Sequence, residues 1–195
     1  MIRLSAFAFS LLAVPCLAQE TAPQDAILVP EGSAQGATGR IAINLAAGTG
    51  NQNLSAASIS IGEVAASNVV GVQASDFDAP DRSTRIGIGN GAFAGISGLT
   101  SVNATAGSSN QAANLAAIAI GNSGTIGDLE LAQVGAPIEP HEARAAPDGS
   151  LNDTIAIADD AFGDGSGLVQ LNLVGGEGNA SANTFVLSVS APGGE

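Results

Sequence analysis

The sequence predicts an all-β protein, a β-solenoid or stacked β-arch built from three imperfect repeats of 36 residues. Three segments, 27–62, 86–121 and 155–190, align without insertion, and self-similarity of this length is typical of solenoids and stacked arrays. Within each segment apolar and small residues alternate with a period of two, as they do in half-buried strands. The chain has 26 Gly and neither Trp nor Tyr, so backbone pairing and close stacking must replace a bulky aromatic core.

The first residues, 1–18, are interpreted as a secretory signal peptide. A positive start at Arg3 is followed by an apolar run over 4–14, and small residues precede the predicted cleavage after Ala18. This run is shorter than the roughly 20 residues of a membrane-spanning helix, so we expect no stable membrane insertion after cleavage. The formal charge of −13 then becomes −14, because Arg3 is the only charged residue lost.

Each repeat is expected to contain three strands joined by turns. In the first repeat these strands cover 27–29, 40–46 and 54–61, and Gly and Asn within 48–52 mark a tight turn. Short strands over 69–72 and 129–134 are expected after the first two repeats, and a helix over the Ala-rich stretch 111–120 is the alternative to a strand there. The expected organisation is a signal peptide (1–18), an N-terminal linker (19–26), repeat 1 (27–62), a spacer (63–85), repeat 2 (86–121), an acidic Pro-containing spacer (122–154), repeat 3 (155–190) and a C-terminal tail (191–195).

Five positions carry the same residue in all three repeats. If the repeats stack, equivalent residues lie about 4.7–4.8 Å apart, and Asn side chains hydrogen-bond to their copies in a ladder. Glycine at the bends avoids a Cβ clash between successive turns, and the Ile positions form an apolar row. The predicted structural positions are Ile27, Gly39, Asn44, Gly48, Asn51, Ile86, Gly98, Asn103, Gly107, Asn110, Ile155, Gly167, Asn172, Gly176 and Asn179.

A pair of aromatic residues distinguishes the second and third repeats from the first. Phe93 and Phe162 occupy equivalent positions, and Ala34 stands there in the first repeat. Terminal units of a repeat array are commonly atypical, so the first repeat is predicted to be a capping end of the stack.

The charge balance and the missing side chains exclude several classes of function. With 18 Asp and Glu against five Arg and no Lys, the chain cannot neutralise a phosphate backbone, which excludes nucleic acid as a partner. His141 is the only histidine, and its acidic loop favours a solvated side chain over a general base. We therefore expect no enzyme, no catalytic residues and no cofactor.

Two acidic segments, 76–81 and 159–164, could supply the oxygen ligands that calcium prefers. Neither has the spacing of an EF-hand loop or of a calcium-binding nonapeptide repeat. Solvated surface turns are the favoured interpretation, with Arg82 and Arg85 pairing with these local acids, and no metal site is predicted.

Two stretches of the repeats, Ile43–Asn53 and Val102–Ala112, resemble the Fap-type functional amyloid proteins. Both have a strand, an Asn, small residues around a Gly and then Asn-Gln, and the Gly-x-x-Asn step is shared with curlin repeats. The third repeat departs from the pattern by having Ala180 in place of Gln, and the first lacks the Phe. The resemblance implies export through an outer-membrane secretion apparatus and assembly into biofilm fibres with copies of itself or with related fibre subunits.

We therefore predict a secreted structural protein that self-assembles into extracellular amyloid-like fibres by β-strand stacking, at or beyond the cell surface of a bacterium after passage through the periplasm. Repulsion among the acidic copies is expected to delay assembly, and low pH or high salt to accelerate it. The alternative is a monomeric secreted β-solenoid with capped ends, acting as an adhesin or as a calcium-binding surface protein.

Overall fold

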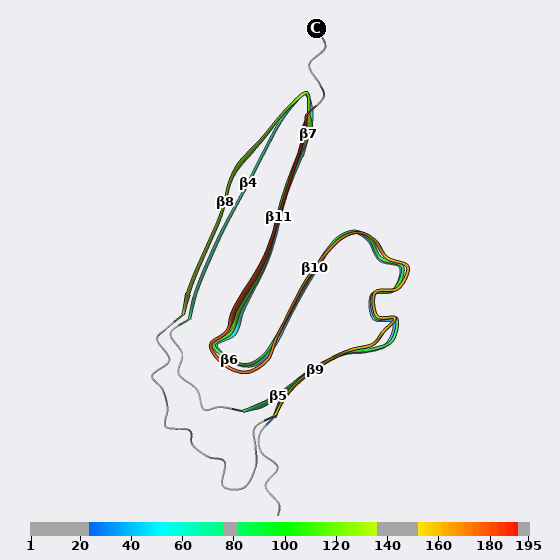
Figure 1. Cartoon of the computed structure of the whole chain (residues 1–195), viewed down its shortest axis with the longest axis vertical. Coiled ribbons are helices and arrows are strands. Elements are labelled where there is room, and N and C mark those ends of the chain that lie inside the picture. Colours follow the sequence, from blue (N-terminus) through cyan, green and yellow to red (C-terminus); the bar gives the residue numbers. More distant parts are fainter. Residues whose placement is uncertain (1–23, 76–81, 136–151, 191–195) are drawn as a thin grey trace, which may run out of the picture.

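The computed structural model describes residues 24–75, 82–135 and 152–190 (Figure 1). The predicted signal peptide, the acidic segment 76–81 and His141 lie outside these residues. All the regular secondary structure in the described residues is β-strand. The strands are β1 (Gln24–Val29), β2 (Thr38–Thr49), β3 (Gln52–Ile61), β4 (Val64–Ser75), β5 (Ser83–Ile88), β6 (Ser97–Ser108), β7 (Gln111–Gly121), β8 (Ser123–Gly135), β9 (Asp153–Ile157), β10 (Ser166–Val174) and β11 (Ala180–Ser190).

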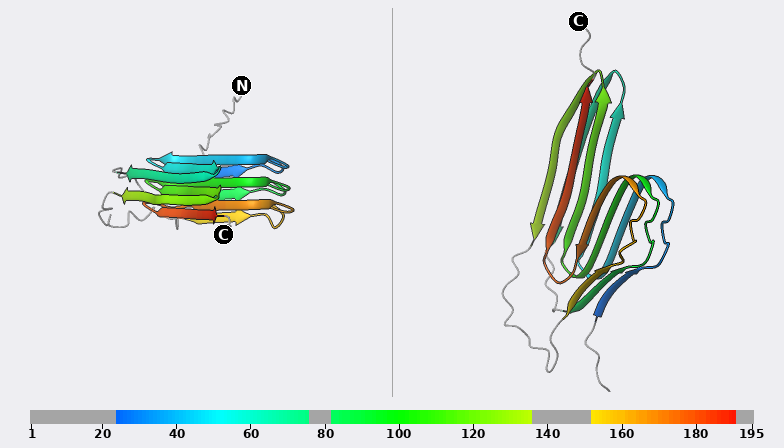
Figure 2. Two further views of the ribbon diagram at one scale, coloured as in Figure 1. Left: turned by 90° about the horizontal axis from the view of Figure 1, so that it is seen from above. Right: turned by 45° about the vertical axis from the view of Figure 1, so that its right-hand side comes forward.

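The strands form three stacked rungs, which lie one above the other in the left view of Figure 2. Rung 1 consists of β1 to β4, rung 2 of β5 to β8, and rung 3 of β9 to β11. Equivalent strands of successive rungs pair in parallel and form four sheets. We name them sheet A (β1-β5-β9), sheet B (β2-β6-β10), sheet C (β3-β7-β11) and sheet D (β4-β8).

The strand register places equivalent residues of the repeats directly opposite one another. Ile27 pairs with Ile86 in sheet A, and Ile86 pairs with Ile155. Sheets B and C have the same offsets along their strands, with Asn44 opposite Asn103 and Asn103 opposite Asn172. The predicted all-β, solenoid-like stack is therefore confirmed, and a strand, β7, replaces the alternative helix over 111–120.

Each rung folds back on itself, as Figure 1 shows when the stack is viewed end on. The first strand leads into an arc of turns, residues 30–37 in rung 1, and the second strand returns from the arc. The third strand runs the other way beside it, and a reversal at Gly62 leads into the fourth. Sheet C therefore lies between sheets B and D.

The fourth strand carries the chain from one rung toward the next. The side-chain amide of Gln73, on β4, donates to the carbonyl oxygens of Gln52 in rung 1 and Ala112 in rung 2, at 2.9 and 3.2 Å. Because one side chain reaches both rungs, β4 lies at a level between them. This strand begins at Val64, five residues earlier than the expected short strand over 69–72.

The apolar core lies in the spaces between the layers. The largest cluster fills the space between the arcs and sheet B, where Phe93 and Ile96 are fully buried beside Val102. A second cluster joins sheets A and B around Ile86 and Ala104. Sheets C and D enclose a third, in which Val69 packs with Leu115, Ala117, Leu54, Ala56 and Leu131. No rung could bury these side chains alone, so stacking is what closes the core.

Candidate assembly interface

A ladder of asparagine side chains runs through sheet B along the stacking axis. The amide nitrogen of Asn103 donates to Oδ1 of Asn44 at 2.9 Å, and that of Asn172 donates to Oδ1 of Asn103 at 2.9 Å. Asn103 and Asn172 are buried, whereas Asn44, in the first rung, is exposed. A buried amide is tolerated only when it is hydrogen-bonded, and the neighbouring rung supplies the bond.

A second polar column faces this ladder from sheet C. Ser55, Asn114 and Asn183 lie in register, and the amide of Asn114 donates to Oδ1 of Asn103 at 2.9 Å. The amide of Asn183 donates to Oδ1 of Asn114 and of Asn172, both at 3.0 Å. Sequence reasoning did not single out this column, because the first repeat has Ser where the other two have Asn. A polar residue at the same buried strand position in all three repeats was the available signal.

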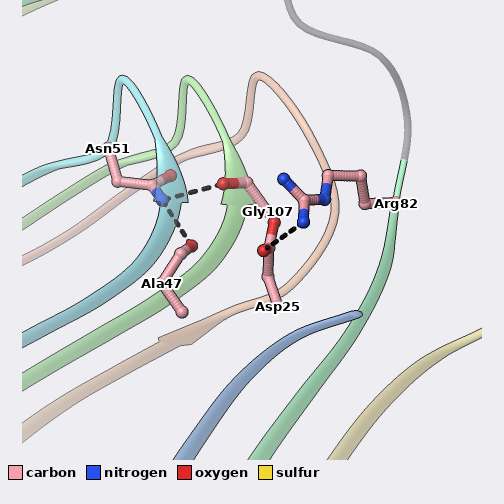
Figure 3. Close-up of polar contacts among 5 residues, drawn as sticks. All are labelled: Asp25, Ala47, Asn51, Arg82 and Gly107. Atoms are coloured by element: carbon pink, nitrogen blue, oxygen red, sulfur yellow. Dashed lines mark hydrogen bonds and ion pairs between the residues drawn. The ribbon is translucent and has the colours of Figure 1, made fainter. Parts of the chain in front are cut away.

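The asparagines of the turn between the second and third strands connect the rungs in a different way. The amide of Asn51 donates to the carbonyl oxygen of Ala47 in its own turn and to that of Gly107 in the next rung, both at 2.8 Å (Figure 3). Asn110 repeats this pattern with Gly176 of rung 3, at 2.7 Å. Each side chain therefore both closes its own turn and fastens it to the next.

Two rows of glycine lie where successive rungs approach most closely. Gly98 and Gly107 have φ of 119° and 106°, in the region that favours glycine. A Cβ at Gly98 would clash with the backbone of Gly39, and one at Gly107 with the backbone of Gly176. At Gly39 a Cβ would meet nothing within 4 Å, because no rung lies beyond it. The glycine is thus required by stacking as well as by the turn.

The aromatic pair predicted at equivalent positions comes together in the arcs. The rings of Phe93 and Phe162 are stacked, with centroids 4.9 Å apart and planes at 16°. Phe93 is fully buried, and Ala34 of rung 1 packs against the same cluster. The aromatic column is therefore two rings long.

In the described residues, the two ends of the stack expose unpaired strand edges. At the rung-1 end these are the edges of β1, β2, β3 and β4, and at the rung-3 end those of β9, β10, β11 and β8. At the rung-3 end Ile155 is 47% exposed, whereas its counterpart in the middle rung, Ile86, is 0% exposed. At the rung-1 end the corresponding Ile27 stays buried, but Leu28 and Ile59 are exposed. Both ends therefore combine open backbone hydrogen-bonding groups with uncovered apolar side chains.

An ion pair lies beside the glycine turn at the rung-1 end. Nη2 of Arg82 lies 3.3 Å from Oδ1 of Asp25, whose side chain is 8% exposed (Figure 3). Among the described residues, Arg82 thus pairs with an acid of β1, and the local acids of 76–81 that the sequence suggested lie outside these residues. The reason is the register, which places the start of β5 beside the start of β1.

The acidic residues of the third arc do not gather into a ligand set. Asp160 and Asp164 line an open hollow of about 590 Å³ on the outside of the arcs, together with Glu31 of rung 1. Within the described residues no three His, Cys, Asp or Glu side chains lie close enough to hold a metal ion. The segment 76–81, the other part of the calcium alternative, lies outside them.

The described part of the chain contains no helix with the length and apolar character needed to span a bilayer.

Comparison with known proteins gives one matching family. No solved structure matches the chain. The sequence model of the functional amyloid protein FapB/FapC family matches residues 17–190, which include all three rungs.

Proposed function

Because the chain belongs to the functional amyloid protein FapB/FapC family, we propose that it builds extracellular fibres by joining copies end to end along the stacking axis. The family is one of structural amyloid proteins and not of enzymes. The observation that supports this mode of joining is the pair of open ends, which expose unpaired edges of the same parallel sheets.

In sheets A, B and C the rung-3 end matches the rung-1 end of a second copy. Continuing the register would place Asn44 of the next copy against Asn172, and Gly39 of the next copy against Gly167. The amide ladder and the glycine row would then run across the joint as they run between rungs. Each addition satisfies one set of open backbone groups and exposes an identical new set, which is how a stack extends without limit.

The proposal includes the route and the destination of the protein. The predicted signal peptide over 1–18 would direct export to the periplasm, and an outer-membrane secretion apparatus would complete it. The fibres would contribute to a biofilm matrix and to adhesion, alone or together with related fibre subunits.

Fibre diffraction on residues 19–195 after quiescent incubation tests the assembly, with thioflavin binding followed in parallel. Reflections near 4.8 and 10 Å are expected from strand and sheet spacings. A soluble β-rich protein that never forms fibres at any pH or salt concentration would contradict the proposal.

A pair of glycine variants tests the end-to-end geometry. Gly39→Ala points its Cβ out of the rung-1 end, so we expect the chain to keep its β-structure but to elongate at least about tenfold more slowly. Gly98→Ala places the same methyl group inside the stack, and we expect loss of the fold itself. Both positions have positive φ, so the backbone strain of roughly 1–2 kcal/mol is common to the two variants.

Circular dichroism and seeded elongation separate the two effects. If Gly39→Ala elongates as fast as the unaltered chain, the copies do not join through the rung-1 end in this register.

A further inference from the structure

Two register columns of sheet A and its arcs alternate between charged and neutral residues. Asp25, Thr84 and Asp153 lie opposite one another in the three rungs. Two residues beyond the paired ends of these strands, the same register aligns Glu31, Asn90 and Asp159. The backbone N–H of Gly32 donates to the carbonyl oxygen of Asn90 at 3.1 Å and joins the first two arcs there. In both columns the middle rung places an uncharged residue between two acids.

An end-to-end joint between copies would remove this separation. Rung 3 of one copy would meet rung 1 of the next, so Asp153 would lie against Asp25 of the next copy, and Asp159 against Glu31 of the next copy. Strands in a sheet are about 4.8 Å apart, which brings like charges within direct interaction distance. The joint would therefore contain two acid–acid contacts. Within one chain, the contacts between successive rungs in these two columns contain none.

The surroundings of the first pair do not neutralise both carboxylates. Asp25 has Arg82 at Oδ1, while its buried Oδ2 has no hydrogen-bond partner among the described residues. Asp153 accepts hydrogen bonds at Oδ1 from the hydroxyl and the backbone N–H of Thr84, at 2.6 and 3.2 Å. Among the described residues, one cation thus serves two acids.

In the part of the chain that the structure describes, the other groups around these acids are neutral or acidic. From the turn of sheet B, Gly48 lies against Oδ2 of Asp25, and Gly176 lies on the corresponding side of Asp153, followed along the chain by Glu177. The acids of the second pair are exposed, and their arc neighbours are Asn90 and, in rung 3, Asp160. No cation from these elements offsets the extra charge at the joint.

We propose that the contact between copies is proton-dependent, with Asp153 and Asp159 on the rung-3 end setting the dependence against Asp25 and Glu31 of the incoming copy. Two carboxylates held this close bind a proton more tightly together than either does alone, so joining takes up protons and is favoured as the pH falls. The inference rests on the proposed end-to-end assembly and specifies how its rate is controlled.

Two double variants with the same change in net charge test this. Asp153→Asn with Asp159→Asn removes the acids that face acids, and Asn at position 153 keeps an oxygen that can accept from Thr84. Asp160→Asn with Asp164→Asn is the control, because the register places these two residues against Gly32 and Gly36 of the next copy. Asn is among the residues that tolerate the positive φ of Asp164.

Seeded elongation is measured at about pH 5 and at about pH 7.5 for each chain. We expect the unaltered chain and the control to elongate about tenfold faster at the lower pH, and the Asp153/Asp159 variant to be fast at both. If both variants change the pH dependence of elongation equally, only net charge matters and the proposal is overturned. It is also overturned if both variants elongate at the rate of the unaltered chain at each pH.

Proton uptake gives a second readout that needs no variant. Assembly of the unaltered chain in weakly buffered solution at about pH 5 is expected to consume protons in proportion to the copies joined. Fibres that form with no proton uptake would overturn the proton-dependent contact while leaving end-to-end assembly intact. An unaltered chain that forms no fibres at any pH would instead contradict the proposed function.

Discussion

At the scale of single residues, the interior of the stack depends on paired amide columns. Asn103 is fully buried and hydrogen-bonds to Asn44 in the rung above, to Asn172 in the rung below and to Asn114 in the facing sheet. Removing one side chain from such a network leaves buried donors and acceptors without partners, and each costs about 1–3 kcal/mol.

We therefore predict that Asn103→Ala lowers the free energy of unfolding by about 3 kcal/mol or more. Asn44→Ala is the matched control, because Asn44 occupies the same column at the exposed end, and we expect a loss of less than about 1 kcal/mol in the isolated chain. Urea denaturation followed by circular dichroism measures both. Equal midpoints for the two variants would mean that the buried ladder contributes nothing to stability.

The sequence identified these columns only where the three repeats are identical. Asn44, Asn103 and Asn172 stand out by simple alignment, and the structure brings them together. The facing column was missed since Ser55 breaks the identity with Asn114, although a serine hydroxyl can complete the same network and does so with Asn44 at 2.9 Å. Which residues face one another across two sheets depends on the path of the rung, which alignment does not contain.

At the scale of elements, the arcs are held by the aromatic pair as well as by backbone hydrogen bonds between rungs. Phe93 is 0% exposed and stacks on Phe162, so Phe93→Ala would leave a cavity in the largest core cluster. We predict a loss of about 3–5 kcal/mol for this variant, and a smaller one for Phe185→Ala, whose ring is only half-buried in sheet C. Thermal or urea unfolding distinguishes them, and an equal loss would show that the arc does not depend on the stacked rings.

The fourth strand shows how far sequence patterns predict an element. Only 69–72 and 129–134 have clear strand character, yet β4 and β8 run over 12 and 13 residues and pair along most of their length. Their first halves are rich in Ala, Ser, Gly and Thr, so local preference is weak. The adjacent sheet C supplies a contact there, because the Ser67 hydroxyl donates to the carbonyl oxygen of Ser58 at 2.8 Å. A register shift between Ser67 and Val69 shows that this sheet follows the repeat less strictly than the others.

At the scale of the whole molecule, the number of rungs determines the length of fibre axis that each copy occupies. Three rungs at about 4.8 Å each give about 14 Å of fibre axis per copy. We predict that scanning transmission electron microscopy of unstained single filaments gives a mass per length of one chain per about 14 Å. A value of one chain per 4.8 Å would show that each copy contributes a single rung and would contradict stacking of the folded chain.

The number of rungs and their register followed from the sequence, but the path of the rung did not. Insertion-free alignment is enough to predict that Gly48, Gly107 and Gly176 lie in a row. The order of the four sheets depends on the bend of each arc and on contacts between strands far apart in the chain, such as those of Gln73. These contacts have no periodic signature in a single sequence.

Every strand pair between rungs is parallel, and this has a consequence for symmetry. A two-fold axis that joined two copies through the same end would turn one stack over, and the joint would not continue the parallel register of the columns. Joining that continues the register is therefore heterologous, with one end of a copy meeting the other end of its neighbour. A filament built this way has a direction, and its two tips present different chemistry to whatever binds them.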